Sequence, residues 1–97
     1  MHRSVDLKLV QAVRSGDAEA FERMYGRFLP PVARFARKQC SSNREAEEPT
    51  GAILAAVFSH LEGYTGRVAL DAWVLVVARR VGQARPSEHA GGATLET

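Results

Sequence analysis

At 97 residues the chain is long enough for one domain, which at this size buries roughly 60 to 65% of the surface that the unfolded chain exposes. Its single cysteine excludes an intrachain disulfide and a cysteine zinc cluster, and its formal net charge is only +2. The charges are nevertheless segregated, with +5 over residues 1–44, −4 over residues 45–66 and +3 over residues 67–85. Such segregation suits a protein that offers a basic face to nucleic acid and an acidic face to another partner; solvated helix faces are an equally good explanation.

No segment of the sequence predicts an export signal or a membrane span. The N-terminal run MHRSVDLKLVQAV is too polar for a signal peptide. The longest apolar run, from Ala72 to Ala78, falls far short of the roughly 20 residues that a membrane helix needs. We therefore expect a protein of the reducing cytoplasm without a membrane partner.

The first predicted helix is short and lies near the N-terminus. Apolar side chains recur there at helical spacing, at Val5, Leu9, Ala12 and Val13. Gly16 follows at the place where a left-handed helix cap would sit. Asp17 can then cap the next helix, because its carboxylate can accept the amide hydrogen of Glu19 or Ala20.

The second predicted helix carries the main apolar stripe of the chain. Its apolar side chains step by three and four residues, at Phe21, Met24, Tyr25, Phe28, Val32, Phe35 and Ala36. Pro30 and Pro31 interrupt this pattern, because a proline lacks the amide donor and crowds the preceding turn. We therefore expect a kink or a break, with a restart near Leu29.

The third predicted helix has two possible starts. Ser42 and Glu45 form a capping-box pattern, in which the hydroxyl and the carboxylate each accept a backbone amide hydrogen. Either a first turn ends before Pro49, or the helix begins with Pro49 in its first position, where the missing donor costs nothing. Its buried side is expected to consist of Ile53, Leu54, Val57, Phe58 and Leu61.

The last predicted helix runs from about Val68 to Val81 and stops near Gly82. Its valines also suit a strand, but the sequence offers no second strand, and a lone strand leaves its amides unpaired. The elements together predict an all-α fold, a compact bundle of about four helices over residues 1–85. Residues 86–97, PSEHAGGATLET, are expected to form a mobile tail.

The sequence contains no catalytic motif. It has no zincin pair, no glycine-rich phosphate loop and no nucleophile elbow, and its histidines lie far apart, at His2, His60 and His89. Glu45, Glu47 and Glu48 could serve as acid-base or metal carboxylates, but acids are common in a first helical turn because they complement the helix dipole. We therefore predict no enzyme activity, no metal and no cofactor.

One stretch of the chain suggests a function. From Glu45 to Arg80, EAEEPTGAILAAVFSHLEGYTGRVALDAWVLVVARR joins an acid-led helix to a Trp-bearing apolar helix through a short loop. This order resembles conserved region two of the bacterial extracytoplasmic-function sigma factors, the promoter-melting subunits of RNA polymerase, with their run AEDLTQEVFLRAWRAL, an RFRG-type loop and FRTWLYRIARN. Upstream, DLKLVQAVRSGDAEAFERMYGRFLPPVARFARK resembles the family's opening, so the resemblance covers roughly residues 6 to 82. It implies the helical fold of sigma region two and a role in transcription initiation.

The acid-led helix carries the polymerase contacts that the resemblance implies. In the family this helix docks on the clamp helices of the polymerase β′ subunit. Glu47 and Thr50 match the family motif, and Glu48 is a longer version of the usual Asp. Gly51 replaces the family's Gln and Ala52 replaces the next acid, so two polar anchors are missing.

The loop GYTGR matches the family element that captures a base flipped from the nontemplate strand of the minus-ten promoter element. The resemblance implies that Tyr64 stacks on this base, a contact worth roughly 1 to 3 kcal/mol, and that Thr65 also contacts the DNA. Arg67, Arg79 and Arg80 would follow the phosphates. Alternatively, Tyr64 closes the core under a tight turn and the arginines lie in solvent.

The helix after the loop departs from the family pattern. Trp73 matches the family's conserved Trp and is expected in the core. Leu75 and Val76 replace a Tyr and an Arg that suit the DNA side, and they leave an apolar patch that needs a cover.

The sequence thus leaves two functions open. The first is a stand-alone region-two domain that binds RNA polymerase and promoter single strand, completed by a companion protein with the helix-turn-helix domain for which these residues leave no room. The second is a protein-interaction module, a homodimer or a decoy that occupies an anti-sigma factor or another regulator. We favour the first, because the loop and the arginines after it are retained.

Overall fold

The computed structural model describes the backbone of residues 2–84 and the side chains of residues 5–82. Within this range the chain forms helices and turns and no strand, so the predicted all-α fold is confirmed. The expected tail over residues 86–97 lies outside the described range. The elements are α1 (His2–Arg14), α2 (Ala18–Arg37), α3 (Glu47–Ser59), the short 3-10 helix η1 (Leu61–Gly63) and α4 (Leu70–Ala84).

Helix α1 follows the predicted apolar pattern only in part: Leu9 and Val13 are half-buried and pack against the core. Val5 is 66% exposed, whereas Asp6 and Val10, four residues apart, face the interior. The end of the helix follows the prediction: Gly16 has a φ of 91°, and the amides of Gly16 and Asp17 donate to the carbonyls of Val13 and Ala12 in a Schellman arrangement. The sequence between α1 and α2 therefore fixes its own turn.

Helix α2 is a single helix through both of its prolines, so of the kink or break expected there, the break does not occur. Asp17 caps its first turn, because its Oδ1 accepts the amide hydrogen of Ala20 at 3.1 Å. Pro30 and Pro31 cannot donate to the carbonyls four residues earlier, but those carbonyls belong to exposed residues, where water can replace the lost donors. The buried side chains of the helix occupy every fourth position on both sides of the prolines, at Ala20, Met24, Phe28, Val32 and Ala36.

Two aromatic residues predicted for the buried stripe of α2 lie at the surface. Phe21 is 41% exposed and Tyr25 is 39% exposed. Both rings pack instead with Phe58 of α3, and the ring centroids of Phe21 and Phe58 are 4.5 Å apart. The expectation that Phe58 is buried holds only in part, since its side chain is half-buried.

Helix α3 begins at Glu47, after a separate turn. The predicted capping pair forms in that turn: the Glu45 amide donates to the Ser42 hydroxyl at 3.1 Å, and the Ser41 amide donates to the Glu45 carboxylate at 3.0 Å. Pro49 is the third helical residue rather than the first. The proline is tolerated there because the first four amides of a helix have no partner within the helix.

Helix α4 starts two residues later than expected, at Leu70, and continues past Gly82. Gly82 does not end the helix. A Cβ added to it would make ordinary van der Waals contact, at 3.6 Å or more, with the side chains of Gln39 and Phe35 at the end of α2, so this position does not require a glycine. None of the described helices combines the length and the apolar character that a membrane span requires.

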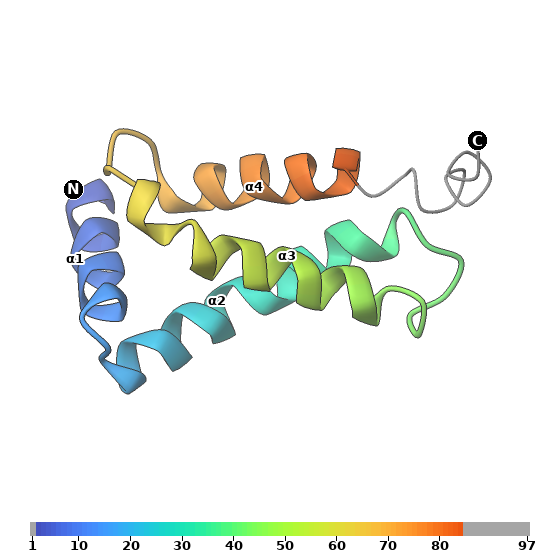
Figure 1. Cartoon of the computed structure of the whole chain (residues 1–97), viewed down its shortest axis with the longest axis horizontal. Coiled ribbons are helices and arrows are strands. Elements are labelled where there is room, and N and C mark those ends of the chain that lie inside the picture. Colours follow the sequence, from blue (N-terminus) through green and yellow to red (C-terminus); the bar gives the residue numbers. More distant parts are fainter. Residues whose placement is uncertain (1, 85–97) are drawn as a thin grey trace.

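The core lies between α2, α3 and α4, and α1 lies across one end of these three helices (Figure 1). Each large apolar side chain buried there contributes roughly 1.5 to 3 kcal/mol. The residues of the core cluster are Val10, Met24, Phe28, Val32, Ile53, Leu54, Val57, Leu61, Tyr64, Leu70, Val74 and Ala78.

Candidate nucleic-acid and partner interface

Residues 61–70, the α3–α4 turn, comprise η1, the segment 64–69 and the first residue of α4. Arg14 of α1 holds the beginning of this turn. Its Nη2 donates to the backbone carbonyls of Leu61 and Tyr64, each at 2.6 Å, and its Nε donates to the Leu61 carbonyl at 3.2 Å. A single guanidinium therefore binds carbonyls that are 47 and 50 residues away in sequence.

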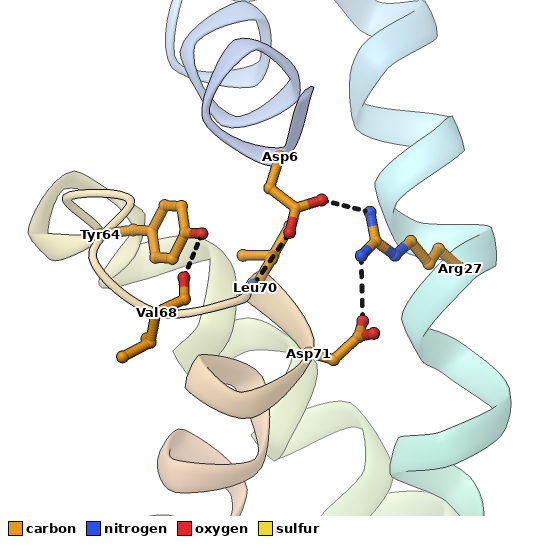
Figure 2. Close-up of polar contacts among 6 residues, drawn as sticks. All are labelled: Asp6, Arg27, Tyr64, Val68, Leu70 and Asp71. Atoms are coloured by element: carbon orange, nitrogen blue, oxygen red, sulfur yellow. Dashed lines mark hydrogen bonds and ion pairs between the residues drawn. The ribbon is translucent and has the colours of Figure 1, made fainter. Parts of the chain in front are cut away.

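Asp6 of α1 holds the end of the same turn. The residue is 5% exposed, and its Oδ2 accepts the backbone amide hydrogen of Leu70 at 3.0 Å, which caps the first turn of α4 (Figure 2). Oδ1 pairs with Arg27 at 3.1 Å, and Arg27 in turn pairs with Asp71 at 3.0 Å. These contacts join α1, α2 and α4 at the point where the turn ends.

Arg27 keeps its charge in this network. Burial acts to lower the pKa of its guanidinium, but the hydrogen bonds and charges of Asp6 and Asp71 outweigh burial and raise the pKa above its ordinary value. A raised pKa means that the stabilisation from a charged Arg27 is fully present at physiological pH, and that it is lost only as the pH rises through the folded-state value.

Tyr64 lies in the core beneath the turn. Its side chain is 2% exposed, its hydroxyl donates to the Val68 carbonyl at 2.6 Å, and its ring meets the edge of Trp73 at a centroid distance of 5.5 Å. From this position the ring cannot stack on a DNA base. Of the two roles that the sequence left open for Tyr64, closing the core is the one that its position allows, and Trp73 packs against the core as expected.

The remaining residues of the predicted DNA-binding set are exposed. Thr65 and Arg67 lie on the turn, while Arg79 and Arg80 lie on the outer side of α4. Leu75 and Val76 are also exposed, and each precedes one of these two arginines by four residues, so all four side chains share one helix face. The outer face of α4 therefore combines apolar and cationic groups.

The predicted partner-binding residues of α3 divide into two groups. Glu47 and Glu48 are exposed in its first turn. Thr50 is only 7% exposed, and its hydroxyl donates to the Ala46 carbonyl at 2.6 Å, so the hydroxyl is used inside the helix rather than offered to a partner. Gly51 is exposed, and a Cβ added to it would meet nothing within 4 Å.

Sequence reasoning missed Asp6 and Arg14, whose partners on the turn are far away in the chain. The only local signal was a carboxylate at Asp6, four residues from the buried Val10 and so on the inner side of α1.

Among the described residues no group of three His, Cys, Asp or Glu side chains could hold a metal ion.

The chain matches a known family over most of the helices just described. The model of sigma-70 region 2 matches residues 24–83, which run from within α2 almost to the end of α4. This span covers more than half of the chain and includes the whole α3–α4 turn, but it leaves α1 outside. No curated protein and no solved structure matches the chain significantly.

Proposed function

Because the chain belongs to the sigma-70 region 2 family and so has a sigma-factor-like role in transcription initiation, we propose that it binds RNA polymerase core and the single-stranded minus-ten element of promoter DNA. The observation that carries this proposal is the family match itself, which covers the α3–α4 turn and α4 together with their exposed arginines. Domains of this family interact with polymerase core and promoter DNA in general.

In the proposed complex, the cations follow the phosphates of the displaced strand. Arg67 on the turn and Arg79 and Arg80 on α4 provide the positive charge, and each phosphate that they neutralise releases counterions. Thr65, also exposed on the turn, is proposed to donate a hydrogen bond to the strand. Tyr64 supports the turn from beneath and does not stack on a base.

The polymerase contact is proposed for the first turn of α3. Glu47 and Glu48 are the exposed acids there, and the clamp helices of β′ are the proposed partner. Gly51 and Ala52 add no polar group, so this contact is expected to be weaker than one made by a complete family motif.

A second candidate function is favoured by the exposed apolar residues. Leu75 and Val76 lie on the same face of α4 as the arginines, and Phe21 and Tyr25 form an exposed aromatic surface on α2. Apolar side chains gathered at the surface are typical of protein contacts. In this alternative the chain forms a homodimer or occupies an anti-sigma factor or another regulator, and it does not bind DNA.

The test of the first function measures binding to a fluorescent minus-ten nontemplate oligonucleotide by anisotropy, together with recovery of polymerase core in a pull-down. We expect the double variant Arg79→Ala/Arg80→Ala to bind the oligonucleotide roughly tenfold more weakly, because two phosphate contacts are lost. The matched control is Arg34→Ala/Arg37→Ala, which removes two exposed arginines of α2 and should bind as the unaltered chain does.

Absence of both oligonucleotide binding and polymerase recovery at low salt would rule out the first function. The second function is tested separately, because it requires self-association or a protein partner. Sedimentation that shows a strict monomer, with no sigma regulator retained, would count against it.

A further inference from the structure

Helix α1 contacts the α3–α4 turn at its beginning, its middle and its end. Arg14 binds the carbonyls of Leu61 and Tyr64, and Asp6 binds the amide of Leu70. Between these points, Leu7 lies so close to Gly66 that a Cβ added to the glycine would be 3.3 Å from the Leu7 Cδ2 atom. All three contacting residues lie in a helix that the family match does not include.

Several hydrogen bonds of the turn go to α1, although the turn also has one of its own, in which the Tyr64 amide donates to the Leu61 carbonyl at 3.0 Å. The Leu61 and Tyr64 carbonyls point toward the Arg14 guanidinium, and bonds to a charged donor are stronger than those between neutral groups. Leu70 is the first residue of α4, so its amide has no acceptor within the helix and takes the Asp6 carboxylate instead. Gly66 has a φ of 84°, a left-handed conformation that only a glycine adopts readily, and Leu7 closes the space beside it.

We propose that Asp6 and Arg14 are positioning residues of the nucleic-acid site, which set the backbone of residues 61–70 so that Thr65 and Arg67 are presented to the displaced strand. This inference rests on the proposed function, because it assigns to α1 a part in the same site. Neither residue needs to touch the DNA, since each acts through the backbone of the turn.

A positioning role predicts a particular set of losses. Without the Arg14 side chain, the two carbonyls lose their charged donor and the turn samples open conformations, some of which move Tyr64 away from Trp73. Trp73 is the only tryptophan of the chain, so its fluorescence reports this movement directly. The strand must then reorder the turn as it binds, which lowers affinity while the number of phosphate contacts stays the same.

The experiment compares Arg14→Ala and Asp6→Asn with the unaltered full chain by three measurements. These are amide hydrogen exchange across residues 61–70, the emission spectrum of Trp73 and anisotropy titration with the minus-ten oligonucleotide at several salt concentrations. The matched control is Asp17→Ala, which removes the cap of α2 and lowers stability without touching the turn. Arg14→Lys, which keeps the charge and can still donate to a carbonyl, should recover part of the lost affinity.

For Arg14→Ala we expect roughly tenfold faster exchange in the turn than in the control, a shifted Trp73 emission and about fivefold weaker binding with an unchanged salt slope. If Arg14 touched a phosphate itself, the slope would fall by about 0.7. Any one of three results would overturn the proposal. These are a reduced salt slope, amide hydrogen exchange in the turn equal to that of the control, and unchanged affinity for the oligonucleotide despite faster exchange in the turn. Should Arg14→Ala fail to fold, Asp6→Asn and Arg14→Lys carry the same comparison.

The two proposals can fail separately. If the unaltered chain does not bind the oligonucleotide, the proposed function fails, and with it the assignment of Asp6 and Arg14 to a nucleic-acid site. Turn exchange and Trp73 emission, which need no DNA, would still decide whether α1 fixes the turn.

Discussion

Tyr64 shows how a residue in a family motif can be placed by contacts that the motif does not contain. The sequence put it on a short glycine-flanked loop, where both an exposed and a buried ring were possible. Trp73 provides the edge against which its ring packs, and the Val68 carbonyl accepts its hydroxyl hydrogen. Its burial was therefore decided by the way the turn folds back on α4, which spacing in the sequence does not reveal.

At the residue scale, replacing Tyr64 by Phe should cost about 1 kcal/mol of unfolding free energy. The variant keeps the ring in the core and leaves the Val68 carbonyl without its hydroxyl donor. The change can be measured by urea denaturation. Tyr25→Phe is the matched control, because Tyr25 is 39% exposed. Loss of its hydroxyl should change the unfolding free energy by less than about 0.5 kcal/mol. Equal effects of the two substitutions would contradict the role assigned to the Tyr64 hydroxyl.

At the scale of the helix, signals confined to a few neighbouring residues were read correctly. Gly16 and Asp17 end α1 and cap α2 as predicted, since all of their partners lie within five residues. Of the kink or break expected at Pro30 and Pro31, the break was wrong, because a non-local effect decided the outcome. Buried side chains at four-residue intervals on both sides of the prolines pack into one core, and this packing holds the two halves of α2 in a single helix.

The open position at Gly51 leads to a prediction about α3. Gly51→Gln places a better helix former at an exposed site with free space, so the unfolding free energy should rise by about 0.5 kcal/mol. Under the proposed function the variant also restores the Gln of the family motif, and it should retain more polymerase core in the pull-down.

The control for this prediction is Gly26→Gln, a glycine-to-glutamine change in α2. Gly26 is likewise exposed and helical, with nothing within 4 Å of an added Cβ, so it should give the same gain in stability. It should give no gain in polymerase recovery. Equal recovery by both variants would mean that α3 does not face the polymerase.

On the scale of the whole molecule, the segregated charges of the sequence fall on different parts of the bundle. The acids of α3 begin at the end of that helix far from the α3–α4 turn, whereas Arg67 lies on the turn itself (Figure 1). The separation is partial, because Glu62 of the acidic block lies on the same turn as Arg67. Composition could predict that Glu47 and Glu48 lie apart from Arg67, because these two acids begin one helix and Arg67 follows it. The network of Asp6, Arg27 and Asp71 could not be predicted, because it joins α1, α2 and α4 only after they have packed.

The proposed strand contacts give a quantitative salt dependence. If Arg67, Arg79 and Arg80 each neutralise one phosphate, the logarithm of the binding constant should fall with the logarithm of salt concentration with a slope of about −2. Removing Arg79 and Arg80 should reduce the slope to about −0.7. Anisotropy titrations between about 50 and 200 mM salt measure both values. A slope that the double substitution leaves unchanged would show that other cations hold the strand.

The hydrogen bond between Asp6 and Leu70 joins residues 64 positions apart in sequence, and this has a practical consequence for dissecting the protein. A fragment trimmed to the borders of the family match would keep every arginine of the proposed site and would lose the carboxylate and the guanidinium that anchor the backbone between α3 and α4. Such a fragment would be a poor substitute for the full chain in a binding assay, because a negative result would not separate the loss of α1 from an inability of the chain to bind.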